Sequence, residues 1–280
     1  MKISIITINY NNAEGLRKTL TTVAEQSYRD IEHIIIDGCS TDGSVDVIKE
    51  YVSSNPNIDP FFKHSIKWVS EKDSGIYNAM NKGIKKATGA YVQILNSGDI
   101  FASADVVERM VAEIEKEEYP EFIYGNMIKK DYATGKILGK SKKVEYSLRQ
   151  YYASTMNHDC CYIRRDLFDT YGMYDENLKI VSDWKWFMQA IGLGKVNPVY
   201  VDIDVTIFDA SGISETNLEL REKERQQVLD ELLPPALLVE YDKYTFPMEE
   251  YNRLEKYHLW KLVWFVERVF FKLEKWHIFK

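Results

Sequence analysis

The stretch Tyr91-Val-Gln-Ile-Leu-Asn-Ser-Gly-Asp99 decides the expected fold. It starts as an apolar run, and a strand that is buried on both faces of a sheet is a near-continuous apolar run. Four small polar residues, Asn96, Ser97, Gly98 and Asp99, follow this run directly. The pattern therefore predicts a buried strand with a carboxylate just beyond its carboxyl end.

Five further runs along the chain have the character of strands, and helical segments separate them. The predicted strands are Ile3 to Ile8, Ile31 to Ile36, Ile66 to Val69, Tyr91 to Leu95, Phe122 to Met127 and Val199 to Ile207. Two sets of apolar residues have the spacing of one helix face: Leu16, Leu20, Val23 and Ala24, then Val106, Met110, Val111 and Ile114. Strands that alternate with helices predict an α/β fold with a mostly parallel sheet.

Composition limits the class of protein before any motif is considered. The chain has 280 residues, of which 45% are hydrophobic and 28% charged, which suits one large globular domain with an appendage. A net charge of −7 argues against a nucleic-acid partner. Cys39, Cys160 and Cys161 are odd in number and two are adjacent, which argues against a disulfide framework. With no signal-peptide pattern at the start, we expect a reducing, cytoplasmic location.

Polar clusters follow the first four predicted strands. They are Asn9 to Asn12, Asp37 to Gly43, Glu71 to Gly75, and Asn96 to Asp99. Each cluster alone is typical of a turn or a helix cap. Ligands of open α/β sheets, however, bind beyond the carboxyl ends of the strands. Four such clusters at one edge of a sheet therefore indicate a ligand site.

The chain lacks the glycine-rich phosphate motifs. Neither G-x-G-x-x-G after the first strand nor G-x-x-x-x-G-K-[ST] occurs, which excludes the dinucleotide fingerprint and the P-loop. Asp99 could instead recruit a hard divalent cation, which commonly bridges one or two carboxylates to substrate phosphates. Without a cation, this carboxylate would repel a diphosphate.

These segments together resemble the family 2 glycosyltransferases of GT-A fold. The matching pieces are Ser4 to Asn11, Ile36 to Gly43, Ser70 to Gly83 and Leu95 to Asp99, in the order and spacing of the family. The resemblance covers roughly residues 1–215. It implies a Rossmann-like, mostly parallel sheet sandwiched by helices, with a donor-binding half at about 1–100 and an acceptor half at about 101–215. Residues 216–280 would form a C-terminal helical extension.

The resemblance also implies a nucleotide-sugar donor and assigns residues to it. Thr7, Asn9, Asp37 and Asp73 would lie near the base and ribose, with Asn96 and Ser97 also at the donor. Asp99 would bind Mn²⁺ or Mg²⁺ at the diphosphate. Asn96 and Gly98 replace other members of the usual D-x-D motif, so Asp99 is the only acid in the turn. The Asn96 amide could contact ribose or close an Asx-turn.

Glycosyl transfer needs a base that removes the proton of the acceptor hydroxyl. Ser182-Asp183-Trp184 resembles the acid pair before an aromatic residue in the family, which implies that Asp183 is this base. The alternative is a helix N-cap, a position that Asp favours. Direct displacement by the acceptor would invert the anomeric configuration.

Four further residues are candidates for contacts with the acceptor or the phosphates. His158 lies in a segment that resembles the His-Gln segment beside the family's acceptor site, with Asp159 in place of Gln. Trp184 follows the candidate base. Ser211 and Gly212 lie in Ala210-Ser-Gly-Ile-Ser214, which resembles the flexible loop that closes over the donor, although an ordinary turn would use glycine as well.

The C-terminal residues differ in charge from the rest. Residues 252–280 carry seven Lys or Arg and three Glu, a net charge of +4, which leaves −11 for residues 1–251. An amphipathic basic helix is predicted at about 252–277, and its longest uncharged run is far short of the ~20 residues of a membrane span. It would lie on an anionic membrane surface, or pack on the catalytic domain or a second subunit.

The sequence thus predicts an inverting glycosyltransferase that moves a hexosyl or N-acetylhexosaminyl group from a nucleotide-sugar, with UDP favoured by resemblance. The acceptor would be a saccharide or lipid-linked saccharide in cell-surface polysaccharide synthesis, which suits the inner face of the cell membrane. A nucleotidyltransferase and a non-catalytic sugar-nucleotide-binding protein stay as alternatives. The oligomeric state stays open.

Overall fold

The computed structural model describes residues 1–54, 65–132, 134–141, 143, 147–209, 217–241 and 243. The chain divides into two compact units, Met1–Val228 and Leu229–Lys280. All the predicted site residues belong to the first unit, but Ser211 and Gly212 lie outside the described residues, as does the predicted basic helix. No helix in the described part of the chain has both the length and the apolar character needed to cross a bilayer.

One sheet forms the centre of the first unit. Its strands are β1 (Ile3–Asn9), β2 (Ile31–Asp37), β3 (Ser65–Ser70), β4 (Tyr91–Ile94), β5 (Ile100–Phe101), β6 (Phe122–Lys130), β7 (Ile137–Lys140), β8 (Cys161–Arg164) and β9 (Val199–Asp209). Their order is β3-β2-β1-β4-β8-β6-β9-β5, and β7 pairs with β6. β1 to β4 pair in parallel, as do β6 and β9, whereas β8 is antiparallel to β4 and β6. The predicted α/β fold with a mostly parallel sheet is confirmed.

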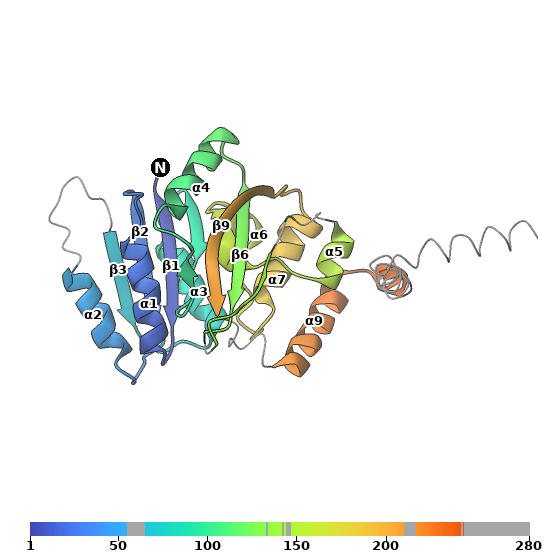
Figure 1. Ribbon diagram of the computed structural model, residues 1–280. Helices are drawn as coiled ribbons and strands as arrows, with labels where there is room; N and C mark the ends of the chain where they lie inside the picture. The colour runs from blue at the N-terminus through green and yellow to red at the C-terminus, as the bar shows by residue number, and fades with distance from the viewer. Residues whose placement is uncertain are drawn as a thin grey trace, which may run out of the picture. The chain divides into compact units, whose positions relative to one another are not determined.

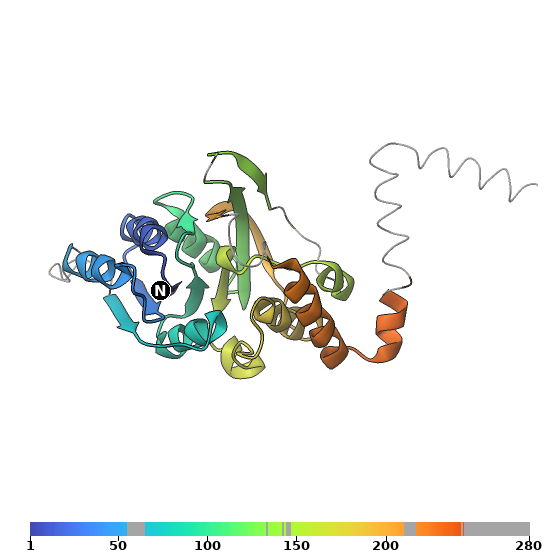
Figure 2. The same ribbon diagram turned by 90° about the horizontal axis from the view of Figure 1, so that it is seen from below.

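Helices cover both faces of the sheet. The helices of the described residues are α1 (Ala13–Ala24), α2 (Ser44–Ser54), α3 (Ile76–Lys86), α4 (Val106–Lys116), α5 (Leu148–Ala153), α6 (Leu167–Tyr171), α7 (Ser182–Phe187) and α9 (Leu218–Leu232), with short turns η1 (His158–Cys160) and η2 (Met188–Gly192). On one face, Leu16 of α1 and Ile48 of α2 pack with Ile35. On the other, a Cβ on Gly83 of α3 would lie 2.3 Å from Cγ2 of Ile6, so glycine permits a close approach. Figure 2 shows α1 and α2 on one side of the strands and α3 on the other.

The parallel strands bring the polar clusters to one edge. β1 and β2 are buried along their whole lengths, which explains their runs of isoleucine. Asn9 pairs in register with Asp37, and Asp37 with Ser70. The backbone N–H of Ser97 donates to Ile8 O at 3.0 Å, which places the exit of β4 beside that of β1. In Figure 1 the arrowheads of β3, β6 and β9 all lie at this lower edge of the sheet.

Candidate active site

Asp37 is the centre of the polar cluster at the ends of β1, β2 and β3. Asp37 is fully buried. One carboxylate oxygen accepts hydrogen bonds from Asn9 Nδ2 at 2.8 Å and Ser40 Oγ at 2.6 Å, and the other accepts from Ser40 N at 3.0 Å and Ser70 Oγ at 2.6 Å. Burial raises the pKa of Asp37, but these donors outweigh it and the net pKa is lowered. Asp37 is therefore an ionised anchor for three strand ends.

Asp73 lies beside the carboxyl end of β2, and Thr7 lies in the interior. Asp73 Oδ1 accepts a hydrogen bond from Gly75 N at 3.0 Å. A Cβ on Gly38 would lie 2.6 Å from Asp73 Oδ2, so a larger residue at this position would displace the carboxylate. Thr7 is fully buried, and its hydroxyl lies 3.0 Å from His33 Nε2. The fold therefore brings Asn9, Asp37 and Asp73 together, with Thr7 behind them.

The turn that carries Asp99 is fixed through its backbone. Gly98 has φ +109°, a conformation that L residues other than glycine rarely adopt. The Thr19 hydroxyl donates to Asp99 O at 2.7 Å and accepts from Gly98 N at 3.0 Å. The Asn12 amide donates to Ser97 O at 3.0 Å. α1 thus holds the turn from one side, and Asp99 is only 4% exposed.

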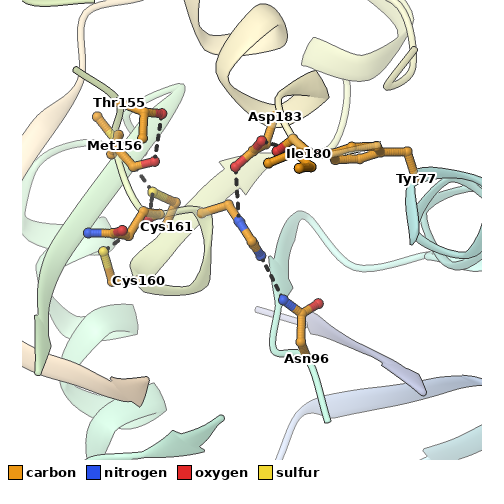
Figure 3. Close-up of polar contacts among 10 residues, drawn as sticks. Tyr77, Asn96, Thr155, Met156, Cys160, Cys161, Ile180 and Asp183 are labelled. Atoms are coloured by element: carbon orange, nitrogen blue, oxygen red, sulfur yellow. Dashed lines mark hydrogen bonds and ion pairs between the residues drawn. The ribbon is translucent and has the colours of Figure 1, made fainter. Parts of the chain in front are cut away.

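Asp183 stands in the first turn of α7 and connects to the Asp99 turn through His158. Asp183 Oδ2 lies 3.2 Å from His158 Nδ1, and His158 Nε2 lies 3.0 Å from Asn96 Nδ2. Figure 3 shows this path between Asp183 and Asn96 as dashed lines. The other Asp183 oxygen lies 2.8 Å from the Tyr77 hydroxyl. The N-cap of α7 is Val181, so the alternative of Asp183 as an N-cap is wrong.

His158 and Asp183 each stabilise the charged form of the other. Burial lowers the pKa of His158, but the hydrogen bond to Asp183 and the charges of Asp183, Asp159 and Asp99 raise it to about 9. Burial raises the pKa of Asp183, but His158 and Tyr77 lower it below its ordinary value overall. At neutral pH the site therefore holds an imidazolium beside a carboxylate.

The amide of Asn96 can adapt to this imidazolium. Its Nδ2 faces His158 Nε2, while its Oδ1 is buried without a hydrogen-bond partner. A charged histidine donates from both nitrogens and needs an acceptor at each. The two ends of an amide are nearly alike in shape, so a half-turn would bring Oδ1 to Nε2–H. We therefore assign Oδ1 of Asn96 as the acceptor whenever His158 is charged.

Trp184 lies beneath Asp183 in the interior. Its ring is 1% exposed, and its Nε1 donates to Tyr151 O at 2.7 Å. The guanidinium of Arg225 on α9 stacks 4.1 Å from its ring centre. The proposed acceptor contact of Trp184 stays a prediction, and the structure gives this residue a packing role.

Comparisons with known proteins identify the family of the chain. Residues 4–172 match the family described as glycosyl transferase family 2. An uncharacterized glycosyltransferase of Mycobacterium tuberculosis (strain CDC 1551 / Oshkosh) is 31% identical over 214 residues, which cover 75% of this chain and 76% of that protein.

Solved structures share the fold. TarS of S. aureus superposes with a TM-score of 0.60 at 19% identity, over 84% of this chain and 41% of TarS. Its fragment 1–349 in complex with UDP-GlcNAc gives 0.59 at 20% identity, over 77% of this chain and 61% of that one. A mannosyltransferase from Pyrobaculum calidifontis in complex with GDP-Man and Mn²⁺ gives 0.60 at 17% identity, over 80% and 61%. Since the family match spans more than half of its residues, the chain belongs to glycosyl transferase family 2 and is a glycosyltransferase of GT-A fold.

Proposed function

We propose that this enzyme transfers a sugar from a UDP-sugar to a saccharide or lipid-linked saccharide, with inversion at the anomeric carbon and Asp183 as the base. The observation that carries the proposal is the path from Asp183 through His158 to Asn96, which connects the candidate base to the turn of Asp99. An acceptor hydroxyl next to Asp183 would thus face a donor whose diphosphate lies at this turn.

Asp183 has the properties that a base requires. Its lowered pKa keeps it ionised at neutral pH, so it can accept a proton. The carboxylate faces the Tyr77 hydroxyl through Oδ1 and the His158 ring through Oδ2, and the backbone N–H of Trp184 also donates to it. A carboxylate has about four acceptor positions, so these three contacts leave room for the acceptor hydroxyl. The contacts with Tyr77 and His158 fix the direction of the carboxylate before the acceptor binds.

A divalent cation fits the residues of the turn. Among the described residues, no group of three or more His, Cys, Asp or Glu side chains could hold a metal ion by itself. Asp99 offers one carboxylate, and Mg²⁺ or Mn²⁺ at such a site takes its other oxygen ligands from phosphates and water. The bound cation would offset the charge of the leaving diphosphate. We propose that Asp99 holds it and that binding of cation and nucleotide is mutually dependent.

The choice of UDP rests on similarity, since the TarS fragment was solved with UDP-GlcNAc whereas the mannosyltransferase was solved with GDP-Man. Asn9, Asp37 and Asp73 gather where base and ribose would bind, and Ser97 lies at the exit of β4. A saccharide or lipid-linked acceptor, cell-surface polysaccharide synthesis and a place at the membrane surface belong to the same proposal.

Titration calorimetry with UDP, with and without Mn²⁺, tests the donor site. We expect binding that needs Mn²⁺ and is lost in Asp99→Ala. Asp105→Ala is the matched control, because Asp105 is an exposed acid six residues further along. Binding that is equally tight without the metal, or equal in Asp99→Ala, would refute the metal assignment. GDP in place of UDP tests the base preference.

Turnover of UDP-GlcNAc, followed as UDP release, tests the base. Asp183→Asn is isosteric but cannot accept the proton. We expect it to lose about 10³-fold in kcat, within the range for general-base catalysis, while UDP affinity stays unchanged. An Asp183→Asn enzyme with normal kcat would exclude Asp183 as the base.

A further inference from the structure

Glu224 on α9 is a buried carboxylate that binds the backbone in front of α7. It is 5% exposed. Its Oε1 accepts a hydrogen bond from Lys179 N at 2.7 Å, and its Oε2 accepts one from Ile180 N at 2.9 Å. Two charge-assisted hydrogen bonds to adjacent N–H groups hold a peptide segment in one position. This segment leads directly into Ser182, where α7 begins.

Ile180 connects Glu224 to the candidate base, Asp183. Its N–H binds Glu224, and its carbonyl oxygen accepts a hydrogen bond from the Tyr77 hydroxyl at 2.6 Å. The same hydroxyl lies 2.8 Å from Asp183 Oδ1. Figure 3 shows Tyr77, Ile180 and Asp183 side by side. The hydroxyl has one proton, which it shares between the Ile180 carbonyl and the Asp183 carboxylate. The contacts form a continuous path from Glu224 through the backbone of Ile180 and Tyr77 to Asp183.

A second residue of α9 contacts α7. Arg225, the next residue after Glu224, stacks on the ring of Trp184 and donates to Tyr152 O at 2.8 Å. Trp184 directly follows Asp183 in the chain. α9 therefore contacts the chain before Asp183, at Lys179 and Ile180, through a carboxylate, and Trp184 directly after it through a guanidinium.

We propose that Glu224 is a positioning residue for catalysis, which sets the direction of the Asp183 carboxylate through Ile180 and Tyr77. The proposal rests on the proposed role of Asp183 as the base. Glu224 lies beyond residue 172, where the family match ends. Helix α9, which lies outside the segment that identifies the family, then helps to position the base.

A purely structural role makes a different prediction. If Glu224 only stabilised the fold, its loss would lower the unfolding midpoint and leave the site of each folded molecule unchanged. If Glu224 positions Asp183, its loss weakens the contact between Asp183 and His158 in the folded protein. The imidazole of His158 reports that contact, because Asp183 is the main group that raises its pKa, with Asp159 and Asp99 as the other charges that face it.

The first experiment is an NMR titration of the His158 ring in the full chain, which needs no substrate. We expect a pKa near 9 in the wild type and a fall toward the ordinary value of 6.5 in Glu224→Ala. Glu224→Gln keeps the size of the side chain but has only one acceptor oxygen, so it should give a smaller fall and serves if Glu224→Ala does not fold. Glu219→Ala is the matched control, since it removes an exposed glutamate from the same helix.

The second experiment is a double-mutant cycle on UDP release from UDP-GlcNAc. We expect Glu224→Gln and Tyr77→Phe each to lower kcat, by up to about 10²-fold for a misplaced group, with UDP affinity unchanged. Because Glu224 acts on Asp183 through Tyr77, the double variant should lose no more than the worse single variant.

The outcomes separate this proposal from the one on which it rests. A His158 pKa of about 9 in both Glu224 variants, or losses in kcat that multiply in the double variant, would overturn the positioning role. A fully active Asp183→Asn enzyme would instead overturn the proposed base, and the NMR titration would still show whether Glu224 orients that carboxylate.

Discussion

His158 is one of the residues at which the two predicted halves of the catalytic domain meet. Its ring contacts Asn96 in the predicted donor half and Asp183 in the predicted acceptor half. An imidazolium there is a fixed positive charge beside the turn at which we propose that the diphosphate binds. Charges that are already in position when the reaction begins cost no reorganisation. The substitution of Asp159 for the family's Gln adds a buried carboxyl that accepts a hydrogen bond from Thr206 at 2.8 Å.

The raised pKa of His158 predicts a loss of stability in mild alkali. The folded pKa of about 9 lies above the ordinary value of 6.5. The stabilisation is therefore fully present below pH 6.5 and is lost as the pH rises through 9. This difference in pKa corresponds to about 3 kcal/mol. Urea unfolding at pH 6 and pH 9.5 should show the loss in the wild type.

His158→Gln is the control for this prediction. Glutamine keeps a hydrogen-bonding side chain but does not titrate, so the variant should lose less stability than the wild type between the same two pH values. Other groups titrate in this range in both proteins, and the comparison cancels them. Equal losses would show that His158 is not the group responsible.

The candidate residues of the site come from the sequence, but their contacts could not be predicted from it. Local motifs propose Asp99, His158 and Asp183, and their roles stay predictions. Asn96 and His158 are 62 positions apart, and Tyr77 and Asp183 are 106 apart. No local pattern encodes pairs at such separations, because the topology of the sheet brings them together. Glu224 had no signal at all, since an isolated glutamate in a charged helix is typical of a solvated face.

At the scale of elements, one glutamate connects the first strands where they begin. Glu32 of β2 is fully buried. It accepts hydrogen bonds from Ser4 Oγ of β1 at 2.7 Å and from Thr88 N at 2.6 Å, and it forms an ion pair with Lys67 of β3. Burial raises the pKa of Glu32, but these donors lower it to about 2. The carboxylate thus ties β1, β2 and β3 to the turn before β4.

Glu32→Gln should destabilise the protein by about 2 kcal/mol at pH 7, the effect expected of hydrogen bonds to a charged group. The folded pKa is below the ordinary value of 4.5, so the contribution is present above pH 4.5 and is lost as the pH falls through 2. The advantage of the wild type in urea unfolding should therefore shrink below pH 4.5.

Glu50→Gln, on α2, is the matched control for Glu32→Gln. Glu50 pairs with Arg17 at 2.8 Å, but both side chains are more than half exposed. Exposed pairs contribute little, so the change should cost less than about 1 kcal/mol. An effect equal to that of Glu32→Gln would show that the buried network has no special role.

Most strands of the sheet were predictable, but β5, β7 and β8 were not. All six predicted strands occur, with ends within a few residues of those expected. β8 was missed because Cys161–Arg164 has only three apolar residues in a row, a run too short to indicate a buried strand. Its antiparallel insertion between β4 and β6 is a tertiary feature that the spacing of the motifs does not encode.

At the scale of the whole molecule, membership of the family decides between the functions that the sequence left open. Transfer of a glycosyl group is the activity of the family, so nucleotidyl transfer and a purely binding role no longer have support. What remains from sequence alone is the segregation of charge. Residues 252–280 carry +4, whereas residues 1–251 carry −11. Since the acidic part should be repelled by anionic lipid, any attraction must come from the basic residues.

We predict that the full chain binds vesicles of phosphatidylglycerol and does not bind vesicles of phosphatidylcholine. Each basic residue near an anionic surface contributes about 1 kcal/mol, and salt screens the attraction. Binding should therefore weaken as salt is raised, and it should be lost when Lys261, Arg268, Lys272 and Lys275 are changed to Gln. Cosedimentation measures both effects. The control variant has Gln in place of Lys49, Lys82 and Lys116, which lie in residues 1–251. An equal loss of binding in the control would place the membrane contact elsewhere on the molecule. If the wild type does not bind, the other predicted role of residues 252–277, packing on protein, is favoured.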